Sequence, residues 1–125
     1  MVDPLWSPGP ERIRNANLTR FIEMVNTRYE LRLQEYTELY QWSIVNREDF
    51  WSTLWDFTGV VSDRKPDHPV VRNGEAMPGA VWFPDTRLNF AENLLRYRDN
   101  HPALIANDET GRVREITYAE LFSEV

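Results

Sequence analysis

Apolar residues recur at helical spacing near the start of the chain. From Leu18 to Tyr29 they fall three or four positions apart, which is one face of an α-helix. Asn17 stands where an N-cap residue is favoured. Residues 1–14 are rich in proline and predict an extended lead-in. The pattern therefore begins with an irregular segment followed by an amphipathic helix.

Two more helices are predicted, over 35–45 and 47–57. Asn46 is a candidate N-cap for the second of them, and Gly59 is placed to end it in the left-handed conformation that glycine favours. Their apolar side chains are Tyr36, Leu39, Tyr40, Phe50, Trp51, Leu54, Trp55 and Phe57.

The next stretch, 62–80, has three prolines and two glycines and predicts a long loop with one tight turn at Asn73-Gly74. A further helix is expected to begin at Asn89, because Asn89 and Glu92 have the spacing of a capping box. Its apolar stripe consists of Phe90, Ala91, Leu94, Leu95 and Tyr97.

The tail predicts a β-hairpin and a helix. Strands are expected over 103–107 and 112–116, and Thr117 with Glu120 has the spacing of a capping box that begins the helix. A lone hairpin and so short a helix are each marginal by themselves. We therefore expect an α+β chain, mostly α, with several short helices and a C-terminal β-hairpin, that is the N-terminal piece of a longer protein.

The charge balance narrows the function classes. The net charge is −6, the pI is about 4.9 and Lys65 is the only lysine, so nucleic acid and anionic membranes are not expected partners. Cysteine is absent, which excludes disulfides and thiolate chemistry. No apolar run approaches the roughly 20 residues that span a bilayer, and the N-terminus lacks the features of a signal peptide. A cytoplasmic protein is expected.

The candidate chemical groups are better explained by structure than by catalysis. His68 and His101 each precede a proline and lack partners at metal-ligand spacing. The acidic pairs at 48–49 and 108–109 fit helix caps and solvated faces. No serine stands in a nucleophile elbow, and no glycine-rich phosphate loop is present. We assign no catalytic, cofactor-binding or metal-binding residue.

The five tryptophans leave two interpretations open. Stacked aromatic rings can form a platform for a sugar or a peptide helix, but those between 50 and 55 fall at the spacing of a helix core, which favours packing. The alternative is an independent helical interaction or regulatory module that binds a partner through exposed tryptophans. The expected core or docking residues are Trp42, Phe50, Trp51, Trp55, Trp82 and Phe83.

Two stretches, "YTELYQWSIVNREDFWSTLWDFTGV" and "AVWFPDTRLNFAENLL", resemble the N-terminal region of acyl-CoA synthetases of the acetyl-/acetoacetyl-CoA synthetase type, within the adenylate-forming superfamily. The "LNFAENLL" form and the opening "PLWSPGPERIRNANLTRFI" are more similar to the acetoacetyl-CoA synthetases. The tail "TGRVREITYAELFSEV" is similar to the first hairpin and helix of that family. Asp85 stands where the family usually has glycine.

The resemblance implies a ligase that joins acetoacetate to coenzyme A through an acyl-adenylate, with ATP, Mg²⁺ and CoA required by the full-length enzyme. The phosphate loop, ribose-binding aspartate and adenylation lysine of such enzymes lie far downstream, so this chain alone is expected to be inactive. It implies an N-terminal helical region over 1–102 and the start of the AMP-binding domain over 103–125. The remainder of that domain is the expected partner, and exposed apolar patches could make the isolated chain self-associate.

Overall fold

The computed structural model describes residues 5–67, 69–111 and 113–125, and the chain divides into two compact units. Met1–Gly59 and Pro66–Pro84 form the first, here called the helical unit. Val60–Lys65 and Asp85–Val125 form the second, the hairpin unit. The described residues contain helices and two small antiparallel sheets, which confirms the α-rich α+β class.

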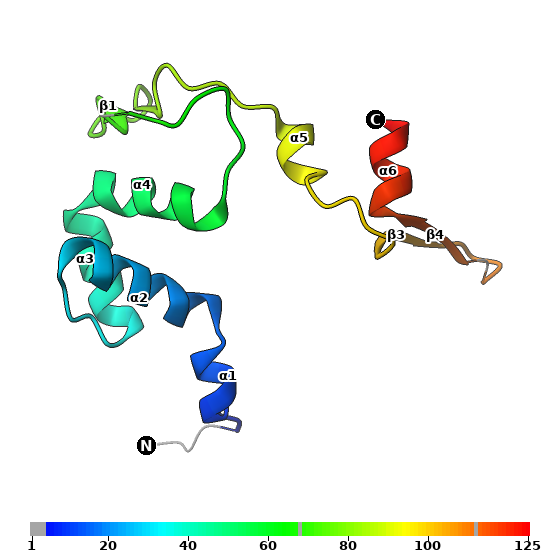
Figure 1. The fold of residues 1–125 in the computed structure, drawn as a ribbon, viewed down its shortest axis with the longest axis horizontal. Helices are drawn as coiled ribbons and strands as arrows, with labels where there is room; N and C mark the ends of the chain where they lie inside the picture. Colours follow the sequence, from blue (N-terminus) through cyan, green and yellow to red (C-terminus); the bar gives the residue numbers. More distant parts are fainter. Residues whose placement is uncertain (1–4, 68, 112) are drawn as a thin grey trace. The chain divides into compact units, whose positions relative to one another are not determined.

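The helical unit contains four helices: α1 (Pro10–Arg14), α2 (Asn17–Tyr29), α3 (Tyr36–Val45) and α4 (Arg47–Thr58). α2, α3 and α4 lie against one another, as Figure 1 shows in blue to green. The three helices predicted from the sequence correspond to α2, α3 and α4, and the predicted bounds agree with the observed ones to within two residues. Gly59 ends α4 with φ 62°, as expected for a left-handed glycine cap.

Two expectations about the start of the chain are wrong. Residues 10–14 form α1 rather than an extended lead-in, because Pro10 occupies the first turn, where its fixed φ suits a helix and no N–H is needed. Ala16, and not Asn17, is the N-cap of α2. Thr19 donates its hydroxyl proton to the carbonyl of Ile13 at 2.6 Å, which ties the two helices together.

The helix caps around α3 also differ from expectation. Asn46 occupies the N-cap position of α4, but its side-chain amide donates backward to the carbonyl of Trp42 at 3.2 Å and caps no N–H of α4. α3 begins with a capping box that the sequence reading missed, in which Glu35 and Glu38 each bond the other's backbone N–H. Glutamate is not among the residues favoured at an N-cap, so the sequence did not indicate this capping box.

The core of the helical unit lies where α2 meets α3 and α4. Its buried residues are Phe21, Ile22, Val25 and Leu39. Thr53 is also fully buried, and its hydroxyl lies 3.1 Å from that of Tyr29, so the polar atom is satisfied. Trp42 and Phe50 pack against this cluster and are partly buried. The centre of the core is therefore formed by phenylalanine and aliphatic side chains, with tryptophan at its edge.

Two short strands lie in the stretch that was predicted to be a loop. β1 (Val71–Arg72) pairs antiparallel with β2 (Val81–Trp82), with Val71 opposite Trp82. The prolines and glycines on either side masked so short a pairing. The predicted turn at Asn73-Gly74 is confirmed: Asn73 has φ 55° and accepts a hydrogen bond from the N–H of Ala76 at 2.9 Å.

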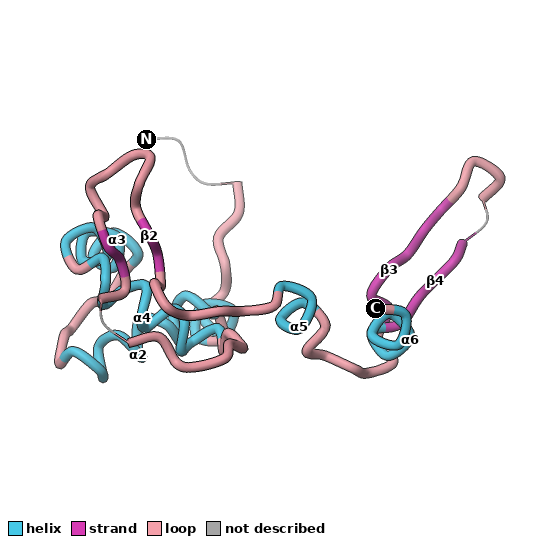
Figure 2. The backbone as a smooth tube through the Cα atoms, turned by 90° about the horizontal axis from the view of Figure 1, so that it is seen from above, coloured by secondary structure: helices cyan, strands magenta, loops and turns pink. Residues whose placement is uncertain are grey.

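The hairpin unit consists of α5 (Phe90–Leu94), β3 (Pro102–Asn107), β4 (Val113–Thr117) and α6 (Tyr118–Glu124). α6 stands at the base of the β3–β4 hairpin, which Figure 2 shows in magenta. The hairpin, its turn and the Thr117–Glu120 capping box are confirmed. α5 is shorter than its apolar stripe suggested, and only Leu95, directly after it, is buried.

The position of the core generates a first prediction. Leu39→Ala should lower the free energy of unfolding of the helical unit by about 2–5 kcal/mol, because it removes buried methyl groups and leaves a cavity. Val45→Ala is the matched control: it lies on the same helix but is 80% exposed, and should change stability by no more than about 0.5 kcal/mol. Tryptophan fluorescence during urea unfolding measures both, since all five tryptophans belong to this unit. Equal losses in the two variants would contradict the assignment of the core.

Candidate functional site

The aromatic side chains of the "VWFP" stretch face α4. Trp82 makes an edge-to-face contact with Trp51, with ring centroids 5.5 Å apart, and Phe83 lies on Trp55 at 4.5 Å. Trp51 and Trp55 are one helical turn apart, so two consecutive residues of the loop meet two rings on one face of the helix. Trp51 and Trp82 remain 39% and 41% exposed, whereas Trp55 and Phe83 are partly buried.

An unusual backbone conformation makes this pairing possible. Successive side chains of a strand point to opposite faces, so Trp82 and Phe83 could not both reach α4 from regular β structure. Phe83 has φ 45°, which breaks the alternation, and its N–H donates to the carbonyl of Val70 at 2.7 Å. Asp85 follows with φ 69°. Aspartate is among the residues that tolerate this left-handed conformation.

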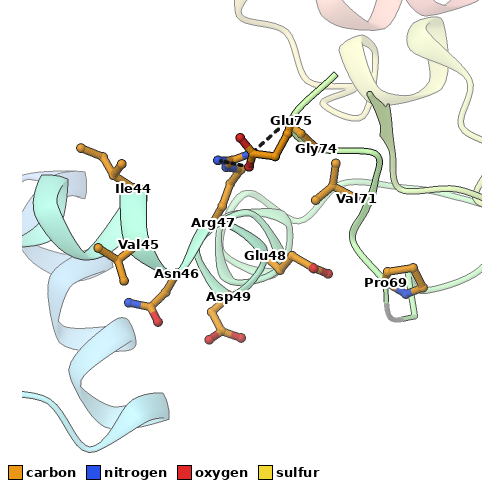
Figure 3. A pocket seen from close by; sticks show the side chains of 10 residues that line it. All are labelled: Ile44, Val45, Asn46, Arg47, Glu48, Asp49, Pro69, Val71, Gly74 and Glu75. Atoms are coloured by element: carbon orange, nitrogen blue, oxygen red, sulfur yellow. Dashed lines mark hydrogen bonds and ion pairs between the residues drawn. The ribbon is translucent and has the colours of Figure 1, made fainter. Parts of the chain in front are cut away.

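A polar hollow of about 800 Å³ lies between the start of α4 and the 69–75 loop (Figure 3). Arg47 crosses it and donates to the carbonyl of Gly74 at 2.9 Å and to the carboxylate of Glu75 at 3.1 Å. Glu48 accepts a hydrogen bond from the N–H of Val70 at 2.7 Å. A Cβ at Gly74 would come within 3.1 Å of the Arg47 guanidinium, so glycine allows this close approach. These charged groups hold the loop on the helix.

Two asparagines hold irregular segments by pairing with one peptide each. Asn26 donates its amide to the carbonyl of Leu33 and accepts from the N–H of Leu33, both at 2.8 Å. Asn93 does the same with Val61, at 2.7 and 2.8 Å, and also donates to the carbonyl of Asn89. A side-chain amide offers the same donor and acceptor as a backbone peptide, so each asparagine substitutes for a strand partner. Backbone groups outside regular structure are satisfied in this way.

Of the two histidines, only His101 lies in the part of the chain that the structure describes, and it does not gather with other candidate ligands. His101 lies at the surface beside Asp99, with Nδ1 3.2 Å from a carboxylate oxygen. His68 falls outside the described residues. Within the residues that the structure describes, no group of three or more histidine, cysteine, aspartate or glutamate side chains could hold a metal ion. The assignment of no catalytic or ligand residue stays a prediction.

Carboxylates at the base of the hairpin have perturbed acidity. The pKa of Glu120 lies below its usual value, first because it accepts a hydrogen bond from the N–H of Thr117, then because of the Thr117 hydroxyl and the charge of Arg114. The pKa of Asp99 is lowered chiefly by the N–H of His101. Both ionised carboxylates therefore stabilise the segments on either side of β3 and β4.

Comparison with known proteins shows what this arrangement is similar to. Residues 36–94, from the start of α3 to the end of α5, match the family described as acetyl-coenzyme A synthetase N-terminus. The structure superimposes on acetoacetyl-CoA synthetase from Streptomyces lividans with a TM-score of 0.83, at 34% identity, over 96% of this chain. The chain is homologous to the N-terminal region of acetoacetyl-CoA synthetases.

Curated relatives agree with that result and show its extent. Acetoacetyl-CoA synthetase from Xenopus tropicalis is 34% identical over 97% of this chain, and malonamoyl-CoA synthetase from Penicillium aethiopicum is 34% identical over 94%. The chain spans 18% of the length of each, and 19% of the solved Streptomyces chain. The resemblance noted from the sequence is thus confirmed, and the alternative of an independent tryptophan-bearing module is not favoured.

The acetoacetyl-CoA synthetase motifs acquire specific roles in this structure. In "LNFAENLL", Asn89 caps α5 by accepting from the N–H of Glu92, as predicted, whereas the pairing of Asn93 with Val61 was missed. The contacts of Arg47 with the loop were also missed. Both join residues about thirty positions apart, and helical periodicity contains no signal for such contacts.

No helix of the described residues is long and apolar enough to cross a membrane.

The Asn93 pairing predicts an unusual pH dependence for one variant. Asn93→Asp should weaken the hold on Val61 at neutral pH by about 1–3 kcal/mol, because an ionised carboxylate cannot donate to the two carbonyls that Asn93 now contacts. Those carbonyls favour the protonated acid, so the folded pKa of the new aspartate should be raised. Its stabilising contribution is then present below about pH 3.9 and lost as pH rises through the folded pKa.

Hydrogen exchange of the Val61 amide measures this effect, with each variant compared with the unsubstituted chain at the same pH. Asn93→Ala is the control, because it loses the pairing at every pH. If Asn93→Ala loses no protection, or if Asn93→Asp loses as much protection at pH 3 as at pH 7, the amide pairing is not what holds Val61.

The Glu120 carboxylate gives a prediction of the opposite sign. Because its folded pKa is lowered, the stabilisation of the α6 N-terminus is fully present above the ordinary value of 4.5 and is lost as pH falls through the folded pKa. NMR titration of the Glu120 carboxyl and the Thr117 amide should show one transition below pH 4.5 at both groups. Glu120→Gln should remove it from the Thr117 amide. A Glu120 transition at or above 4.5 would contradict the cap.

Proposed function

We propose that this chain is the N-terminal part of an AMP-forming ligase that converts acetoacetate, ATP and coenzyme A to acetoacetyl-CoA, AMP and pyrophosphate. The observation that carries the proposal is the match to the Streptomyces enzyme, which combines 34% identity with the same fold over 96% of the chain. The ligase requires ATP, Mg²⁺ and CoA, and these bind residues outside the chain. The enzyme acts in the cytoplasm.

The relatives indicate the chemical class of the acyl substrate. Acetoacetyl-CoA and malonamoyl-CoA synthetases are similar to this chain at the same 34% identity. Acetoacetate and malonamate are both short carboxylates with a carbonyl on the third carbon, and they differ only in a methyl or an amino group on that carbonyl. The substrate class is therefore a short 3-carbonyl carboxylate, with acetoacetate favoured by the larger number of named relatives.

The role of the region is to build and support the adenylation domain. Residues 1–102 form the supporting N-terminal region, and residues 103–125 supply the first hairpin and helix of the AMP-binding domain. The remainder of that domain is the partner of this chain. Apart from it, the chain is inactive and associates with itself through uncovered apolar side chains, several of which are large and exposed.

A chimeric enzyme tests this proposal. This chain replaces the corresponding N-terminal fifth of the Streptomyces lividans enzyme, and pyrophosphate release is measured with ATP and acetoacetate. We expect release by the chimera and none by the same enzyme without its N-terminal fifth, because the matched fold restores the support. The isolated chain should release none. A folded but inactive chimera, or release by the isolated chain, would overturn the proposal.

A further inference from the structure

A second, apolar groove of about 390 Å³ lies on the helical unit, where α2, α3 and α4 meet. Phenylalanines from α2 and α4 form its floor, and leucine and tyrosine side chains form its rim. The residues in question are Phe21, Phe50 and Phe57 in the floor and Leu18, Tyr36 and Tyr40 at the rim.

The groove is free of charge in a chain rich in charge. Among the described residues that line it, none is aspartate, glutamate, lysine or arginine, although such residues make up 27% of the sequence. The hollow beside Arg47 differs, since charged residues line it and hold a loop. Depletion of charge with enrichment in tyrosine and phenylalanine is typical of the centre of a protein–protein interface.

The helix α3 shows that this face is incomplete. Leu39 on α3 lines the groove and is buried in the core, whereas Tyr36 and Tyr40, on the same face of the helix, are 61% and 48% exposed. Their rings stack on each other, with centroids 6.1 Å apart. Glu38 is the only charged residue of the helix. An apolar helix face normally packs against a neighbour along its whole length, and here only the part around Leu39 is covered.

We propose that this groove is the docking site for the later part of the ligase chain, the portion that follows this region in the acetoacetyl-CoA synthetases. The inference rests on the proposed function. The same fold occupies 19% of the solved Streptomyces chain, so in that enzyme most of the polypeptide remains available to cover this face. A second copy competes for this face only in the isolated chain, and there the net charge of −6 on each copy weakens the association.

The lining defines what the occupant presents. A floor of phenylalanine rings takes aliphatic or aromatic side chains, and the two tyrosines offer hydroxyl groups that bond to polar atoms at the edge of an apolar contact. The matching surface is thus an apolar ridge with polar groups at its border. A basic or acidic peptide does not fit this lining, because nothing in it would pair with the charges.

The test compares one substitution in two settings. Tyr40→Arg places a charge in the groove, and Gln41→Arg places the same charge on the same helix, on a residue that does not line the groove. Each is introduced into the isolated chain and into the chimera with the Streptomyces enzyme, and Tm is measured. In the isolated chain, both should shift Tm by less than about 1 °C, because exposed sites tolerate such changes.

In the chimera, Tyr40→Arg should lower Tm by about 3 °C or more, since it buries an unpaired charge, while Gln41→Arg should not. Equal Tm values for the two chimeras overturn the docking proposal alone. If Tyr40→Arg lowers Tm equally in the isolated chain, another part of this chain covers the groove. If the chimera is a dimer that Tyr40→Arg dissociates, a second copy covers it. Either outcome overturns the docking proposal. An unsubstituted chimera that fails to fold overturns the proposed function and this inference together.

Discussion

The packing of Phe21 on α4 is the contact on which the helical unit depends. Its ring meets Phe50 edge-on at 5.7 Å and Phe57 at 5.2 Å, and these residues lie two helical turns apart on α4. One side chain of α2 therefore fixes the position of most of α4. Because Trp51 and Trp55 lie between those two rings in sequence, the same contact places them toward the loop that carries Trp82 and Phe83. The buried phenylalanines thus determine which side of α4 presents Trp51 and Trp55 to the loop.

The irregular segments are held by side chains that replace missing backbone partners. Asn26 and Asn93 each pair with a whole peptide, and Glu48 receives an N–H of the 66–84 segment. These bonds stabilise the chain less by their own net energy than by avoiding the cost of an unsatisfied peptide group. Polar residues of the motif "LNFAENLL" therefore have a structural role in this fold.

The sequence predicted the local features well and the long-range ones poorly. The C-terminal end of α4 and the start of α6 followed from Gly59 and from the Thr117–Glu120 pair, which act within a few residues of themselves. The strands at 71–72 and 81–82 did not, because each is two residues long and they pair across a loop that contains a proline and glycines. Arg47 could not be assigned a partner either, since nothing near it in sequence indicates Gly74. Family resemblance, by contrast, came from the order of many residues and needed no contact to be known.

The path of the chain has a consequence for how this region can be rearranged. The polypeptide passes between the two units three times, after Gly59, after Lys65 and after Pro84. The six residues from Val60 to Lys65 belong with the later part of the sequence, where Asn93 and Arg87 bond to them. No single scission can therefore release one unit intact. Exchange of residues 1–59 alone would place a different α4 against Trp82 and Phe83, so the two segments of the helical unit need to be exchanged together.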